Sequence, residues 1–126
     1  MSIGAEMDAR PVSESYERRI AAARSKFLEA FPRKIGGAIE ICNLVDYEVP
    51  AQRMEDLNVL HHAVHELCGT SGMLGLTDLN REGRSALGVL ETAEAEGRSL
   101  TTTERFELNA GLRRMAKMAE QLTCDA

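Results

Sequence analysis

Apolar residues recur every three or four positions along most of the chain, and no stretch alternates apolar and polar residues over the length of a strand. The clearest stripe comprises Met54, Leu57, Leu60, Val64, Leu67, Ser71 and Leu74. This spacing predicts one face of a helix that opens near Pro50 and ends at a turn containing Gly75. The pattern therefore predicts an all-α protein.

Similar stripes predict further helices before and after this segment. We expect one helix from Ser13 to Phe31 and another from Pro32 to Asn43, because the residue before a proline disfavours helical geometry and a proline suits the first helical position. A helix follows the Gly75 turn and ends at "AEGRS". The final helix begins at "TTTE", where Thr101 and Glu104 can form a capping box.

Short connections between helices of similar length favour antiparallel neighbours. The sequence therefore predicts an antiparallel up-down-up-down four-helix bundle, with the Ser13–Phe31 segment as an additional N-terminal helix. Residues 1–12 mix Gly, Asp, Glu and Pro and are predicted to be a flexible N-terminal tail. Residues 13–126 form the single predicted domain.

Composition narrows the class of partner. The net charge is −5, the basic residues are scattered among acids and only 4% of residues are aromatic, which argues against nucleic-acid binding. No apolar run approaches the roughly 18–20 residues of a membrane span, and nothing near the N-terminus indicates export. Cys42, Cys68 and Cys124 form no CxxC pair, which fits a reducing cytoplasm better than a disulfide scaffold.

Two glycines lie on the polar side of the central helix, beside a histidine. On a helical projection, His65 lies ~130° from the centre of the apolar stripe and Gly69 ~170°. His61 at ~90° and Cys68 at ~70° lie at its boundary, whereas Gly72 at ~110° is directed outward. A glycine inside a helix costs about 1 kcal/mol, and an outward glycine gains no packing in return. We therefore predict that the exposed strip formed by Gly69 and Gly72 gives an external partner access to the His65 ring.

An exposed neutral imidazole carries a free lone pair and can act as a nucleophile. The chain shows no serine–histidine–acid set, no phosphate-binding glycine loop and no pair of catalytic carboxylates, so it is typical of an acceptor rather than of a complete enzyme. His61, His65 and Cys68 have a spacing that zinc ligands can use, but no fourth ligand is evident. We expect neither a metal nor a cofactor.

The segment "HELCGTSGMLGLTDL" resembles the core motif of histidine phosphotransfer (HPt) domains from two-component phosphorelays. That motif reads His-x-Leu-Lys-Gly-Ser/Ala-Ser/Ala, followed by Leu-Gly and a further Leu. The matching residues are His65, Leu67, Gly69, Ser71, Leu74, Gly75 and Leu79. The helical pattern from about Pro32 to Leu122 is also similar to that of the family.

The resemblance implies that His65 is phosphorylated and relays a phosphoryl group between the aspartates of receiver domains in response regulators or hybrid kinases. The receiver would supply Mg²⁺, and the chain would be a monomeric cytoplasmic carrier without an ATP site. His61, Cys68, Gly69 and Gly72 would belong to the surface on which the receiver docks and to the environment of the phosphate.

Two positions depart from the family pattern. Cys68 stands where the family often has lysine, and Leu87 where it often has Gln or Glu. In an antiparallel hairpin that turns near Gly75, Arg84 is level with His65. We therefore predict that Arg84 supplies the missing cation.

Two alternatives stay open. "HEL" is also similar to the phosphorylated segment of sensor histidine kinases, so the chain could be an orphan dimerisation and phosphotransfer hairpin without an ATP domain. Alternatively, it could be a non-enzymatic helical adaptor in which His65 is incidental. Size in solution tests the first alternative, and phosphate on His65 tests the second.

Overall fold

The computed structural model describes residues 2–44 and 50–125, with side chains over 14–43 and 54–124. Within these ranges the chain is all-α, as predicted, and contains no strand. Its four helices are α1 (Ser2–Leu44), α2 (Pro50–Met73), α3 (Thr77–Ala95) and α4 (Thr102–Asp125). None of them combines the length and apolar character that a membrane crossing requires.

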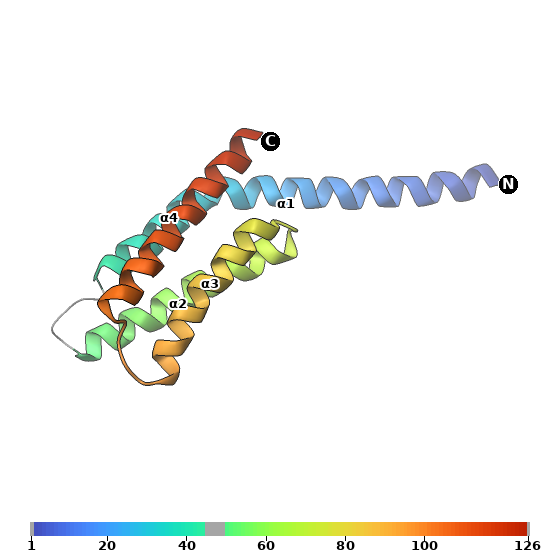
Figure 1. The fold of residues 1–126 in the computed structure, drawn as a ribbon. Helices are drawn as coiled ribbons and strands as arrows, with labels where there is room; N and C mark the ends of the chain where they lie inside the picture. The colour runs from blue at the N-terminus through green and yellow to red at the C-terminus, as the bar shows by residue number, and fades with distance from the viewer. Residues whose placement is uncertain (1, 45–49, 126) are drawn as a thin grey trace.

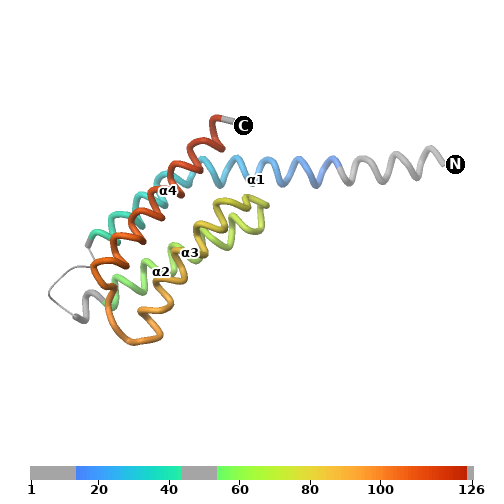
Figure 2. The backbone as a smooth tube through the Cα atoms, viewed as in Figure 1, coloured from blue at the N-terminus to red at the C-terminus, as the bar shows by residue number. Residues whose placement is uncertain are grey.

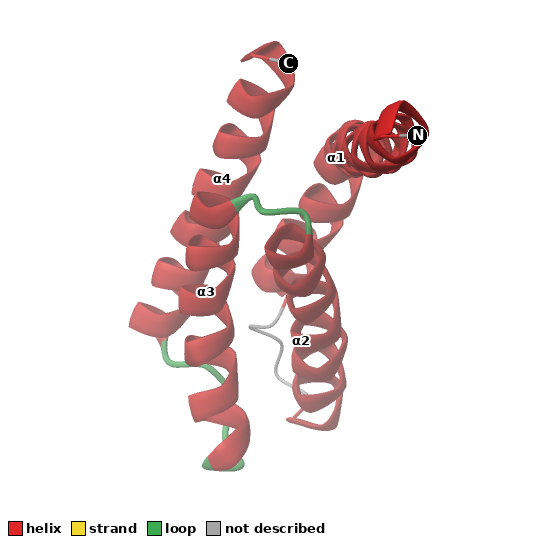
Figure 3. Cartoon of the chain, turned by 90° about the vertical axis from the view of Figure 1, so that its right-hand side faces the viewer, coloured by secondary structure: helices red, strands yellow, loops and turns green. Residues whose placement is uncertain are grey.

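The helices pack in a ring in which each contacts two others. The α1 helix packs against α4 and α2, and α3 packs against α2 and α4. In Figure 1 the N-terminal half of α1 extends well past the other helices. Figure 3, viewed from the side to which α1 projects, shows α2 and α3 joined by a short loop. The surface of α2 that faces neither α1 nor α3 is therefore accessible from outside.

The predicted helix boundary at Pro32 is wrong. A single helix, α1, runs through this proline, so the two predicted N-terminal helices are one, and residues 2–12 of the predicted tail are its first turns. Figure 2 shows that α1 bends along its length rather than running straight, and an interior proline is a usual cause of a helix kink. An interior proline costs about 3 kcal/mol, but a continuous buried stripe spans it and outweighs this cost: Leu28, Phe31, Ile35, Ala38 and Cys42.

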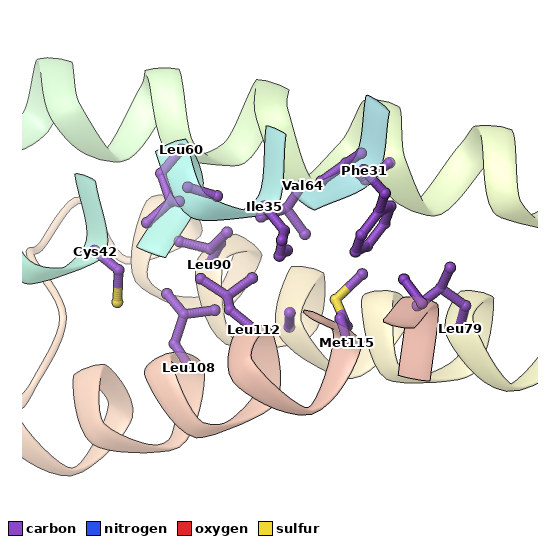
Figure 4. Packing of buried hydrophobic residues seen from close by; sticks show 14 of the residues in the cluster. Phe31, Ile35, Cys42, Leu60, Val64, Leu79, Leu90, Leu108, Leu112 and Met115 are labelled. Atoms are coloured by element: carbon purple, nitrogen blue, oxygen red, sulfur yellow. The ribbon is translucent and has the colours of Figure 1, made fainter. Parts of the chain in front are cut away.

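The core takes side chains from all four helices (Figure 4). The predicted stripe of α2 is buried from Leu57 to Leu74, including Ser71. Met54 is the exception, because its side chain is 40% exposed. Its side chain lines a hollow together with Leu57 of α2 and with Leu90 and Glu94 of α3, and this hollow leaves it partly open to solvent.

Two helices end in the same backbone motif. At the end of α2, the N–H of Leu76 donates to the carbonyl of Ser71 and that of Gly75 to Gly72, at 2.9 and 3.2 Å. Gly75 has a φ of 73°, which favours glycine. Gly97, with a φ of 63°, ends α3 in the same way. The Gly75 turn fixes where α3 begins relative to His65, and the Gly97 turn fixes where α4 begins after α3.

The predicted capping box at the start of α4 is confirmed. The N–H of Glu104 donates to Thr101 Oγ1 at 3.0 Å, and the N–H of Thr101 donates to Glu104 Oε1 at 2.9 Å. Arg98 adds two hydrogen bonds to the same carboxylate, at 2.6 and 3.1 Å. The hydrogen bonds from Arg98 and then from Thr101 lower the pKa of Glu104 to about 2.

Removing this cap is expected to destabilise the protein in a pH-dependent way. Thr101→Ala should lower the free energy of unfolding by about 1 kcal/mol. Because the pKa of Glu104 is depressed in the folded state, its carboxylate stabilises the fold above its ordinary pKa, and this contribution is lost as the pH falls toward 2. Glu104→Gln should therefore cost stability at pH 7 and much less at pH 2, as urea denaturation at both pH values can measure. An equal cost at both pH values would contradict a role for the charge.

Candidate functional site

His65 lies on the exposed side of α2. Its ring contacts that of His61 edge-on, with centroids 6.2 Å apart and planes at 83°. Among the described residues, no hydrogen bond or ion pair involves the His65 ring nitrogens. The imidazole is therefore open to an external reactant.

Gly69, one turn after His65, is exposed and has open space around it. A Cβ built on Gly69 meets no atom within 4 Å. Packing between the described helices therefore does not require a glycine at this position. The structure places Gly69 where the sequence predicted, beside the histidine and directed outward.

Gly72 has an internal reason to be glycine. A Cβ on Gly72 would lie 2.8 Å from Nδ2 of Asn80, whose side chain crosses from α3 and donates to the carbonyl of Cys68 at 2.8 Å. Gly72 thus leaves room for a hydrogen bond that joins α2 to α3. Gly72 was predicted to serve partner access alone, and its contact with Asn80 was not predicted.

Cys68 lies between helices rather than on the exposed strip. Only 5% of its surface is exposed. A Cβ on Gly83 of α3 would lie 3.0 Å from Cys68 Cβ and 3.3 Å from its Cα, so α2 and α3 approach each other closely here. Burial raises the pKa of the Cys68 thiol, and the nearby charge of Arg84 opposes this shift. A thiol packed against a glycine therefore stands where the HPt motif often has an exposed lysine.

His61 is held by carboxylates of α3. Its side chain is 24% exposed, with Nδ1 2.9 Å from Glu94 Oε2 and Nε2 4.0 Å from Glu91 Oε1. The structure thus brings His61 and His65 together, with His61 at the boundary that the projection predicted. The two glutamates were missed because their contact depends on how α2 and α3 align.

Two cations lie on either side of this face. Cys68 is opposite Gly83 and His61 is opposite Glu94, so His65 is level with about residues 86–90 of α3. Exposed Arg84 lies about one turn nearer the α2–α3 connection, where its charge acts on Cys68. On the α1 side, Lys34 Nζ lies 3.5 Å from Oε1 of Glu66. Leu87, at the position where the HPt family often has Gln or Glu, is half-buried and packs against the core.

One missed residue had a signal in the sequence. Gly83 falls on the buried stripe of α3, which comprises Leu79, Gly83, Ala86, Leu90 and Ala93. A glycine at a stripe position indicates a close helix contact, because a larger side chain there would otherwise increase the buried apolar area.

This face offers an imidazole whose ring nitrogens make no hydrogen bond or ion pair among the described residues, beside the open space at Gly69. Within the described parts of the chain, no three His, Cys, Asp or Glu side chains are grouped so that they could hold a metal ion. Comparisons with models of protein families, with curated proteins and with solved structures find no match to this chain.

Proposed function

We propose that the chain is a histidine-containing phosphotransfer protein of a two-component phosphorelay, in which His65 carries the phosphoryl group between receiver-domain aspartates. The observation that supports this most directly is the open His65 imidazole next to Gly69, a glycine that packing does not explain. Such a site suits a carrier that borrows the rest of its active site from a partner.

The proposed transfer is an in-line displacement at phosphorus. A lone pair on one ring nitrogen of neutral His65 attacks the phosphorus of the receiver's aspartyl phosphate. The N–P bond forms as the acyl phosphate O–P bond breaks, and the aspartate carboxylate leaves with the bonding electrons. The second ring nitrogen keeps its proton, so the phosphorylated ring is an imidazolium. The reverse sequence transfers the group to the next receiver, and Mg²⁺ belongs to the receiver in both steps.

The fold supports this proposal. We take the helices as an antiparallel up-down-up-down bundle, in which the projecting part of α1 stands in place of the additional N-terminal helix. All four helices come from one chain, which favours a monomeric phosphotransfer domain over an orphan kinase hairpin that would need a second copy. The three cysteines are unpaired, which supports a cytoplasmic location.

A phosphotransfer profile tests the proposal. The chain is incubated with each phosphorylated receiver of the source organism, and acid-labile, base-stable phosphate on the chain is measured. We expect rapid labelling by at least one receiver. If no receiver labels the chain, it is not a relay protein, and the adaptor alternative gains support.

Arg84 is proposed to stabilise the transferring phosphoryl group in place of the lysine that Cys68 replaces. Arg84→Ala should lower the transfer rate roughly tenfold, because one charge-assisted contact to the transition state is lost. Arg84→Lys, which keeps the charge, should recover part of the rate. An unchanged rate in Arg84→Ala would assign the cation role elsewhere, with Lys34 the next position to test.

A further inference from the structure

The pair of His61 and Glu94 has no part in the proposed relay so far. The pair joins α2 to α3 through a 2.9 Å contact between Nδ1 and a carboxylate oxygen, and the His61 side chain is mostly buried. A partly buried polar contact between two helices fixes the orientation of both side chains. The neighbouring His62 is exposed and has no hydrogen bond or ion pair among the described residues.

The contact also sets which nitrogen of His61 faces the carboxylate. Nδ1 lies 2.9 Å from Glu94 Oε2, and a carboxylate offers only acceptor oxygens to a ring N–H. Glu91 lies on the Nε2 side at 4.0 Å. The ring therefore has one preferred orientation, set by the carboxylates that α3 presents to it.

His65 is the next residue on the same side of α2, one turn later. The edge-on contact between the two rings limits how the His65 ring can turn about its χ2 bond. Transfer requires one particular nitrogen of His65 to point outward toward phosphorus, since in-line attack depends on alignment. A fixed His61 ring would hold that orientation before the receiver arrives.

We propose that His61, anchored by Glu94, is a positioning residue that orients the His65 imidazole for phosphoryl transfer; this inference rests on the proposed function. His61 acts through His65 and does not touch the receiver. Losing His61 should therefore slow the chemical step and leave receiver binding unchanged. This separates the proposal from the earlier expectation that His61 belongs to the docking surface.

The experiment compares His61→Gln and Glu94→Gln with the native chain, using a phosphorylated receiver as donor. We expect kcat to fall about tenfold in both variants, with KM for the receiver changed less than twofold. The double variant should be no slower than His61→Gln alone, because both substitutions remove the same effect. His62→Gln is the matched control and should retain native kinetics.

A second measurement reads the His65 ring without any transfer. In the native chain, two-bond ¹H–¹⁵N spectra should show one dominant tautomer for His65, and nuclear Overhauser contacts should join its ring to that of His61. In Glu94→Gln both signatures should weaken while the melting temperature stays within a few degrees.

The outcomes separate the two claims. A raised KM with unchanged kcat would make His61 a docking residue and overturn the inference. Native kinetics and native spectra in both variants would also overturn it, while the relay itself stands. Absence of phosphate on His65 of the native chain would refute the proposed function, and the positioning role in transfer would fall with it.

Discussion

Gly69→Leu is expected to leave the bundle folded and to reduce phosphoryl transfer at His65 by about a hundredfold or more. A Cβ on Gly69 meets open space, so the leucine fits without strain. Leucine also favours a helix over glycine by almost 1 kcal/mol, so the melting temperature should rise slightly. The new side chain would occupy the space beside His65 that a receiver must enter. Circular dichroism with temperature and the transfer rate measure the two effects.

Gly36→Leu is the matched control for this substitution. Gly36 is also exposed with open space around it, but it lies on α1. It is two residues from Lys34, which points toward Glu66 of α2, so Gly36 faces away from α2. Transfer should be native in this control. If Gly69→Leu transfers at the native rate, the strip is not the docking surface. If it unfolds the protein, Gly69 has a structural role.

Gly83→Leu is expected to have the largest effect on stability. A Cβ on Gly83 would lie only 3.3 Å from the Cα of Cys68, and backbone cannot move aside as a flexible side chain can. We expect the free energy of unfolding to fall by roughly 3 kcal/mol or more as α2 and α3 are forced apart. Urea denaturation measures this change. Ser85→Leu, at an exposed position of the same helix, should stay within about 0.5 kcal/mol of the native value. Native stability in Gly83→Leu would contradict the close contact of the two helices.

The fold was predictable where the spacing of apolar residues within a single helix is sufficient evidence. The stripe of α2 identified its buried face because spacing along a helix fixes direction. The boundary predicted at Pro32 is wrong because it rested on the local preference of proline for the start of a helix. The buried stripe continues across this residue from Phe31 to Ile35. Local preferences yield when burial on both sides of the break is worth more. Met54 shows the opposite limit, since its position on the stripe could not show that it borders a partly open hollow between α2 and α3.

For the candidate site, the sequence predicted which side chains of α2 face outward, but not which residues of other helices they contact. The projection placed His65 and Gly69 outward and His61 at the boundary, as the structure has them. It could not distinguish Gly69, which faces open space, from Gly72, which makes room for Asn80. It also could not place Cys68 against Gly83, because that contact depends on the alignment of α2 with α3. Residues whose roles depend on a second helix were the ones missed.

The central claim is that His65 carries the phosphoryl group, and phosphosite mapping tests it most directly. The native chain, His65→Gln and His62→Gln are each incubated with the same radiolabelled phosphorylated receiver, and the labelled residue is identified by mass spectrometry under basic conditions. We predict phosphate on His65 in the native chain and in His62→Gln, and none in His65→Gln, with all three proteins equally folded. Equal labelling of His65→Gln would contradict the account.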